Sequence, residues 1–190
     1  MIPAVADATP AARARAAAEA LGTETLANWC AELITGAADP IADPDPDPRW
    51  LAGRAWTAWG DPVTWPERGL DHWFRVWAAR TLLHEWHPLA EFAVRSGLAD
   101  RHWRVREMCA KVVARQGLAT AADACAQLAG DDAVTRVRIA ALRALATAGE
   151  YEHGSVVLGC LDDEDRSVVA AAERSRSAME ARLDRSLAEA

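Results

Sequence analysis

The residues best suited to catalysis or metal binding lie in the stretch DHWFRVWAARTLLHEWH, which runs from Asp71 to His87. His84 and His87 are three residues apart, and Glu85 lies beside the first of them. A zinc protease requires two histidines on one face of a helix, as in the H-E-x-x-H pattern. Here Pro88 disfavours helix at the residue before it, so we expect His87 to leave the helix. The stretch therefore predicts no metal site, and the chain contains no serine elbow, phosphate loop or dinucleotide fingerprint.

The cysteines do not form a metal-binding or redox motif either. They are far apart and include no C-x-x-C pair: Cys30, Cys109, Cys125 and Cys160. A structural zinc site needs clustered thiolates. The N-terminal residues have no basic segment followed by an apolar block, so we expect no secretory signal, a cytoplasmic location and reduced, buried thiols. We accordingly predict no disulfide, no bound metal and no cofactor.

The segment DRHWRVREMCAKVVARQG, residues 100–117, indicates another kind of chemistry, because it carries five basic residues. The whole chain has a formal net charge of -7, yet residues 98–145 hold eight Lys and Arg against five Asp and Glu. A local excess of positive charge can attract an acidic protein segment or a phosphate backbone. The alternative is that these cations only hold one helix against the next.

The elements that position these residues are predicted to be helices. Residues 11–20 and 23–35 form two of them, the second with Thr23 as its N-cap and Gly36 at its end. The stretch AADPIADPDPDP, residues 37–48, predicts an extended acidic linker without regular structure. No alternating run indicates a strand, and no apolar run is long enough to span a membrane. We therefore expect one compact all-α unit with three parts: an N-terminal helical segment (1–36), the linker (37–48) and a helical array (49–190).

A repeat of about thirty residues organises the array. Four segments align on an anchor valine, at spacings of 29, 32 and 31 residues: Val76, Val105, Val137 and Val168. Leucine-acid turns precede three anchors, in the sequences LADRH, LAGDDA and LDDED. Behind two anchors, Gly117 and Gly149 end the helix as C-terminal caps would. Each unit is thus a short helix, an acidic turn and a longer helix, and such units bury their apolar faces by stacking.

This pattern resembles the HEAT-like repeats, in the short form also found in bilin-lyase-type proteins. The resemblance is carried by the leucine-aspartate turns, the closing glycines and the pairs Val105-Arg106 and Val137-Arg138. It is close over residues 98–149, extends over 70–97 and 150–178, and does not reach 1–48. It implies an α-α superhelix, a short solenoid of three to four helix pairs, preceded here by the N-terminal helical pair. It specifies architecture and hardly any biochemistry.

The resemblance also implies a structural role for two arginines. In HEAT-like repeats the arginine of the valine-arginine pair usually bonds an aspartate in a neighbouring turn. By this resemblance Arg106 and Arg138 would join adjacent repeats. Their partners would come from the acids of the turns: Asp100, Asp131, Asp132, Asp162 and Asp163.

A second set of cations lies on the outward side of the longer helices, at about 100° of rotation per residue. The repeat keeps two basic positions, one before the anchor and one six residues after it. The residues at these positions are Arg75, Arg104 and Arg136, followed by Lys111, Arg143 and Arg174. We refer to these six residues as the basic ladder and predict that they bind a partner. The alternative is a solvated helix face on which Glu107 pairs with Arg104 and Lys111.

The function indicated is a non-catalytic protein-protein interaction module or scaffold with a concave basic surface. An acidic protein segment is the expected partner, with no membrane contact and no small-molecule substrate. The alternative is DNA binding, because alkylpurine DNA glycosylases are also built from HEAT-like repeats. In those enzymes tryptophans, an aspartate and arginines line the DNA-binding cleft. Five residues of this chain are of the same types, although they match no motif of that family: Asp71, Trp73, Trp77, Trp103 and Arg104. The chain is shorter and more acidic than a protein that clasps DNA should be, and Trp73 and Trp77 also suit packing.

Overall fold

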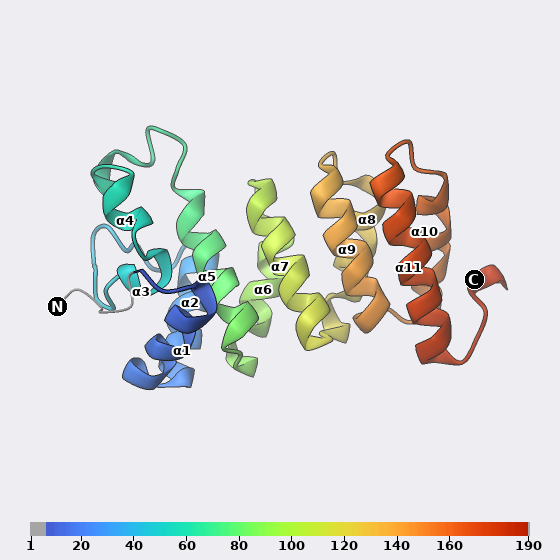
Figure 1. Ribbon diagram of the computed structural model, residues 1–190, viewed down its shortest axis with the longest axis horizontal. Helices are drawn as coiled ribbons and strands as arrows, with labels where there is room; N and C mark the ends of the chain where they lie inside the picture. The colour runs from blue at the N-terminus through green and yellow to red at the C-terminus, as the bar shows by residue number, and fades with distance from the viewer. Residues whose placement is uncertain (1–6, 190) are drawn as a thin grey trace. The chain divides into compact units, whose positions relative to one another are not determined.

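A computed structural model describes residues 7–189 of the chain. Its regular secondary structure is entirely helical within the described residues, with no strand there, which confirms the all-α class (Figure 1). The chain divides into two compact units, Met1–Gly97 and Leu98–Ala190. The division falls after Gly97 and not at the proline-rich stretch 37–48, so each unit is described by itself.

The N-terminal unit is built on a pair of packed helices, α2 and α5, with α1 against both. Thr9 caps α1 and Pro10 begins it. The N-cap expected at Thr23 is absent, since Gly22 holds that position and Thr23 is the first residue of α2. The helices of this unit are α1 (Pro10–Leu21), α2 (Thr23–Thr35), α3 (Arg49–Ala52), α4 (Ala55–Ala58), α5 (His72–His84) and α6 (Glu91–Gly97).

Residues 37–48 contain turns and no helix or strand, and they pack into the N-terminal unit. The Asp39 carboxylate accepts hydrogen bonds from the backbone N–H groups of Ile41, at 2.9 Å, and Ala42, at 3.3 Å. Pro40 and Pro48 are buried. Prolines remove backbone donors, and the aspartates satisfy neighbouring N–H groups locally, so this stretch holds its turns without regular structure.

The tryptophans between residues 50 and 77 supply much of the core of the N-terminal unit. Trp65 is completely buried; its ring stacks on Phe74 with centroids 5.3 Å apart, and Trp56 meets it edge-on at 5.7 Å. Trp59 packs against Trp73 and Trp77 at 5.2 and 5.5 Å. Regular helix is short between residues 49 and 70. Large aromatic side chains bury enough area there to hold irregular backbone in place.

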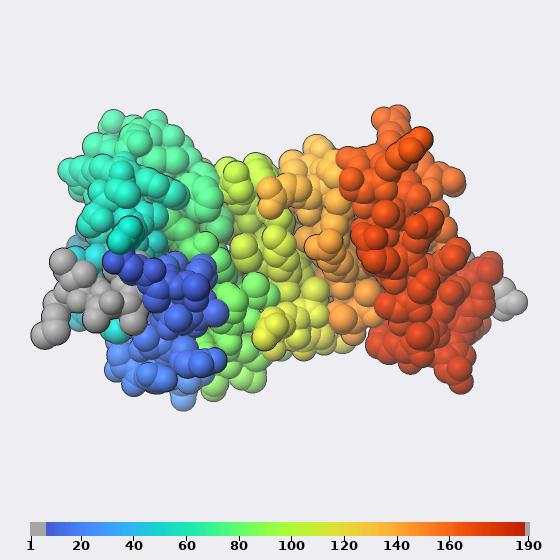
Figure 2. Space-filling model, in the orientation of Figure 1, coloured from blue at the N-terminus to red at the C-terminus, as the bar shows by residue number. Residues whose placement is uncertain are grey.

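The C-terminal unit is a two-layer stack of helices. One layer is formed by α7, α9 and α11, each packed on the next, and α8 and α10 form the other (Figure 1). The outer face of α9 and α11 is turned to the viewer in Figure 2. The helices are α7 (Trp103–Gln116), α8 (Ala122–Asp131), α9 (Thr135–Ala148), α10 (Gly154–Gly159) and α11 (Arg166–Leu183).

The anchor valines of this unit occupy equivalent buried positions, as predicted. Val105, Val137 and Val168 are each completely buried, one on each helix of the first layer. The two closing glycines differ from each other. Gly117 has φ +65° and is a left-handed C-cap, whereas Gly149 has φ −74° and extended backbone. Glycine suits the second position because a Cβ there would lie 2.7 Å from the Leu145 carbonyl oxygen.

Candidate functional site

Two arginines join successive repeats of the C-terminal unit through fork-shaped ion pairs. Arg106, on α7, donates from Nε to Asp132 Oδ2 at 2.6 Å and from Nη2 to Oδ1 at 3.1 Å. Arg138, on α9, makes the same pair with Asp163, with both distances at 3.0 Å. The Asp132 side chain is only 3 % exposed. Two parallel bonds from one planar guanidinium fix the orientation of both groups, so each pair sets the register between neighbouring helices.

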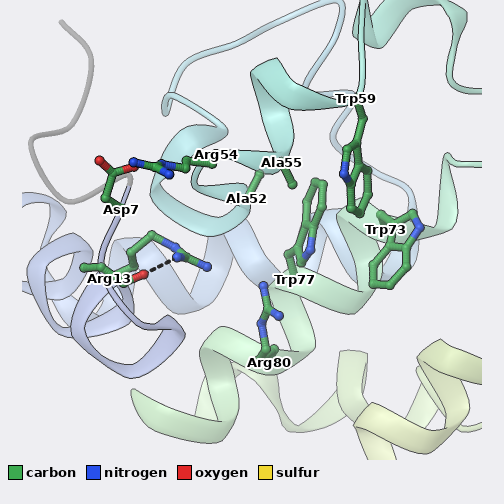
Figure 3. Close-up of a pocket in the computed structure, with 10 residues that line it drawn as sticks. Asp7, Arg13, Ala52, Arg54, Ala55, Trp59, Trp73, Trp77 and Arg80 are labelled. Atoms are coloured by element: carbon green, nitrogen blue, oxygen red, sulfur yellow. Dashed lines mark hydrogen bonds and ion pairs between the residues drawn. The ribbon is translucent and has the colours of Figure 1, made fainter.

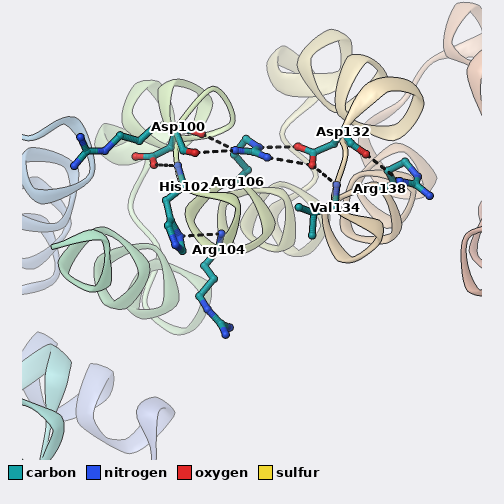
Figure 4. Close-up of polar contacts among 8 residues, drawn as sticks. Asp100, His102, Arg104, Arg106, Asp132, Val134 and Arg138 are labelled. Atoms are coloured by element: carbon teal, nitrogen blue, oxygen red, sulfur yellow. Dashed lines mark hydrogen bonds and ion pairs between the residues drawn. The ribbon is translucent and has the colours of Figure 1, made fainter. Parts of the chain in front are cut away.

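Each of these arginines also holds the turn that precedes its own helix (Figure 4). Arg106 Nη1 donates to the Asp100 carbonyl oxygen at 2.9 Å, and Arg138 Nη1 donates to the Asp132 carbonyl oxygen at 3.0 Å. The aspartates hold backbone in return, since Asp132 Oδ1 accepts the Val134 N–H at 2.8 Å. A chain of bonds therefore runs from one turn to the next through the arginines.

The structure selects among the acids that the sequence offered. Asp132 and Asp163 bond the arginines through their carboxylates, while Asp100 meets Arg106 through its backbone carbonyl. Asp131 and Asp162 are exposed and bond neither arginine within residues 7–189. The selected acids are the residues at which the helical backbone has just ended: Asp132 and Asp163 have ψ values of 128° and 143°. The change to extended backbone turns their carboxylates toward the preceding repeat's arginine.

The outward cations of the C-terminal unit divide into bonded and unbonded groups. Arg143 and Arg174 are exposed and have no hydrogen bond or ion pair within the described part of the chain. Arg136 is 61 % exposed although it reaches Glu107, with Nη2 3.0 Å from Oε1. Lys111 donates to the same oxygen at 2.8 Å. The surface thus keeps exposed positive charge that the fold does not neutralise.

Trp103 and Glu107, which the sequence analysis did not assign to the partner surface, contact its cations. The guanidinium of Arg104 lies 4.3 Å from the Trp103 ring centroid and that of Arg136, from the next repeat, 5.6 Å. Glu107 pairs with Lys111, as the alternative of a solvated helix face predicted. It is nevertheless buried, and it also pairs with Arg136 of the next repeat. Trp103, Glu107 and Lys111 are spaced by four residues, so they line one side of α7. This spacing is the feature of the sequence that could have indicated that Trp103 and Glu107 lie beside the cations.

Arg75 does not have the exposed position expected for a member of the basic ladder. It lies on α5 in the N-terminal unit, its side chain is 16 % exposed, and it pairs with Asp71 at 3.4 Å, one helical turn away. The helix buries much of its surface in the aromatic core, and this draws Arg75 inward. The partner surface considered below is therefore confined to Arg104, Lys111, Arg136, Arg143 and Arg174.

Residues that suggested metal binding or DNA binding have structural roles in the N-terminal unit. His87 caps a short 3-10 helix (Pro88–Ala90), where its Nδ1 accepts the Leu89 N–H at 3.4 Å. Trp77 is 3 % exposed within the aromatic core. No cluster of three or more His, Cys, Asp or Glu able to hold a metal occurs in the described residues. The four cysteines are buried free thiols, and burial raises the pKa of Cys125 to about 12.

Comparison with known proteins identifies the repeat. Residues 91–176 match the family model of HEAT repeats. Neither the curated proteins nor the solved structures contain a match to the chain. HEAT repeats generally mediate protein-protein interaction or scaffolding and are typically non-catalytic. Within residues 7–189, no helix is both long and apolar enough to cross a membrane.

Proposed function

We propose that the C-terminal unit is a non-catalytic interaction module that binds an acidic protein segment along α7, α9 and α11. The observation that carries the proposal is the unbonded, exposed charge of Arg143 and Arg174. The arginines that build the fold, Arg106 and Arg138, are neutralised by buried or half-buried aspartates. Arginines that the fold does not use remain on the outer side of the same helix layer, and their charge is available to a partner.

The composition of the surface favours a protein segment over simple solvation. Lys111 and Arg136 share the one carboxylate of Glu107, and Arg143 and Arg174 have no ion pair within residues 7–189, so positive charge remains on this surface in a chain whose total is negative. Trp103 lies beneath two guanidinium groups and presents a flat apolar contact between them. Tryptophan and arginine are the residues that most often dominate binding energy at protein interfaces. A partner that alternates carboxylates with apolar side chains would satisfy both features.

The test measures binding of a fluorescein-labelled peptide of alternating glutamate and leucine, with a glutamine-leucine peptide as the neutral control. The variant combines Arg143→Glu with Arg174→Glu, because neither residue has a bond to lose. Exposed ion pairs contribute about 0.2–1 kcal/mol each, and reversal turns attraction into repulsion. We expect roughly thirtyfold weaker binding, which corresponds to about 2 kcal/mol. Binding by the wild type should weaken as salt rises.

A matched control separates local from overall electrostatics. Arg15→Glu with Arg95→Glu changes the net charge equally at two exposed arginines of the N-terminal unit. This control should bind the acidic peptide like the wild type. Equal loss in both double variants, or no loss in the first, would refute the proposal. Preference for duplex DNA over the peptide, or excision of alkylated bases, would instead support the nucleic-acid alternative.

A further inference from the structure

The N-terminal unit contains a cavity of about 490 Å³ that the proposed function does not use. It lies between α1, the α3–α4 segment and α5 (Figure 3). Its volume falls within the range of small-molecule binding sites, about 300–1,000 Å³. The residues that line it are Asp7, Ala8, Arg13, Ala52, Arg54, Ala55, Trp59, Trp73, Trp77 and Arg80.

The lining of this cavity carries positive charge that no carboxylate of the unit balances. It contains three arginines and one acid, and that acid, Asp7, is bonded to Arg54. Arg13 is 8 % exposed and donates only to backbone carbonyls, those of Ala8 and Leu51, while its Nε has no partner. Arg80 has no hydrogen bond or ion pair with any residue in the range 7–189. Arg13 and Arg80 therefore both enter the cavity as uncompensated cations.

Such an arrangement of like charges is energetically costly. Burial of a charge away from water is unfavourable unless an opposite charge accompanies it, and buried arginines are normally paired. Burial, together with the positive charge of Arg13, lowers the pKa of Arg80 to about 10. Burial lowers the pKa of Arg13 as well. Both groups are still protonated at neutral pH, so two like charges share one partly desolvated space. An anion placed there would be bound by charge-assisted hydrogen bonds.

The opposite wall of the cavity is flat and aromatic. Trp73, Trp77 and Arg80 lie on one side of α5 at spacings of four and three residues, and Trp59 packs on both indoles. Figure 3 shows the guanidinium groups of Arg13 and Arg80 directed toward the space beside Trp77. A ligand that reaches both guanidinium groups would therefore also contact an indole ring, which favours a planar apolar body.

We propose that this cavity binds a small organic anion with a planar apolar part. Its carboxylate or phosphate lies between Arg13 and Arg80, and its planar part lies against Trp59 and Trp77. The site is independent of the basic face of the C-terminal unit, since every lining residue belongs to the N-terminal unit.

Isothermal titration calorimetry with two matched pairs of probes tests the site and distinguishes its two anionic groups. Adenosine 5′-monophosphate is compared with adenosine, and 2-naphthoate with 2-naphthylmethanol. Hydrogen bonds to charged groups make the anion of at least one pair bind about tenfold or more tightly than its neutral partner. The pair that shows the larger difference identifies phosphate or carboxylate as the recognised group.

The variant Arg80→Met removes the charge and keeps an apolar stem, and Arg15→Met, at an exposed position of α1, is its control. Arg80→Met should abolish the preference for the anion and leave the melting temperature unchanged or higher, because it relieves repulsion from Arg13. Arg15→Met should bind as the wild type does. Three results would overturn the proposal: equal affinity for anion and neutral partner, no binding of either anion at millimolar concentration, or wild-type affinity in Arg80→Met.

Discussion

Removal of the Asp132 carboxylate should destabilise the C-terminal unit more than removal of any exposed acid. This carboxylate accepts three hydrogen bonds, two from Arg106, at 2.6 and 3.1 Å, and one from the Val134 N–H, at 2.8 Å. Its side chain is 3 % exposed, and that of Arg106 is 18 % exposed. Asp132→Ala therefore leaves a mostly buried guanidinium without its counter-charge and the first turn of α9 without a bond to Val134.

The magnitude follows from what each truncation leaves behind. Loss of one member of a buried ion pair costs about 3–5 kcal/mol, because the other charge stays desolvated and unpaired. We expect Asp132→Ala to lower the free energy of unfolding by about this amount. Arg106→Met should cost less, about 1–3 kcal/mol, since Asp132 keeps its bond to Val134. Asp131→Ala is the matched control, an exposed neighbouring acid that bonds neither arginine, and should stay within about 0.5 kcal/mol.

Urea unfolding followed by circular dichroism measures these differences, and hydrogen exchange of α7 and α9 locates them. In the double variant Arg106→Met, Asp132→Ala the losses should not add, because each single change already breaks the same pair. The reasoning fails if Asp132→Ala and Asp131→Ala have equal effects. It fails equally if the two single losses sum to that of the double variant.

Two further predictions concern the caps of the same unit. The Ser167 N–H and the Thr135 hydroxyl, which lies 3.0 Å away, hold the pKa of Asp165 below its usual range. Thr135→Val should raise that pKa in a carboxyl NMR titration. The lowered pKa of Asp165 stabilises the folded wild type at pH values above the pKa of the unfolded chain, about 4. The stability advantage of the wild type over Thr135→Val should therefore fade as the pH falls below about 4. Gly149→Ala should cost about 1–3 kcal/mol, since its Cβ meets a carbonyl oxygen at 2.7 Å, whereas Gly159→Ala, with open space around it, should be neutral or slightly stabilising in urea melts.

The repeat could be predicted from the sequence because its signals are local. Anchor valines, acidic turns and closing residues recur at nearly constant spacing, and each repeat contacts chiefly its neighbours. The choice of Asp132 over Asp131 could not be predicted in this way. It depends on which residue is the first to leave helical backbone, and helix ends are uncertain by one or two positions in any sequence pattern. A difference of one residue exchanges a buried ion pair for a solvated carboxylate.

The features that sequence reasoning missed all depend on contacts between distant segments. Arg13 and Arg80 are 67 residues apart, and nothing in the order of residues indicates that they share a cavity. The residues that line this cavity match no sequence motif, so motifs could not indicate them. Glu107 also looked like a solvated residue by its charge. It is buried because Arg136 of the next repeat extends over it, which only the stacking of the helices determines.

The residue after the anchor valine is an arginine only in the two repeats that form the fork-shaped ion pairs. Arg106 and Arg138 each pair with an acid in the turn that precedes the long helix of the next repeat, and Asp132 and Asp163 supply it. At the fourth anchor the equivalent residue is Val169, on α11.

At the first anchor the equivalent residue is Trp77, which is buried among the aromatic rings of the N-terminal unit. The same position in the repeat thus carries arginine where its side chain reaches a turn aspartate and tryptophan where it packs among the aromatic rings of its own unit. Because an unpaired buried charge costs far more than a lost ion pair contributes, matching the residue to its neighbour matters more than keeping the arginine. Within the C-terminal unit, the arginine at this position therefore joins each repeat to the next.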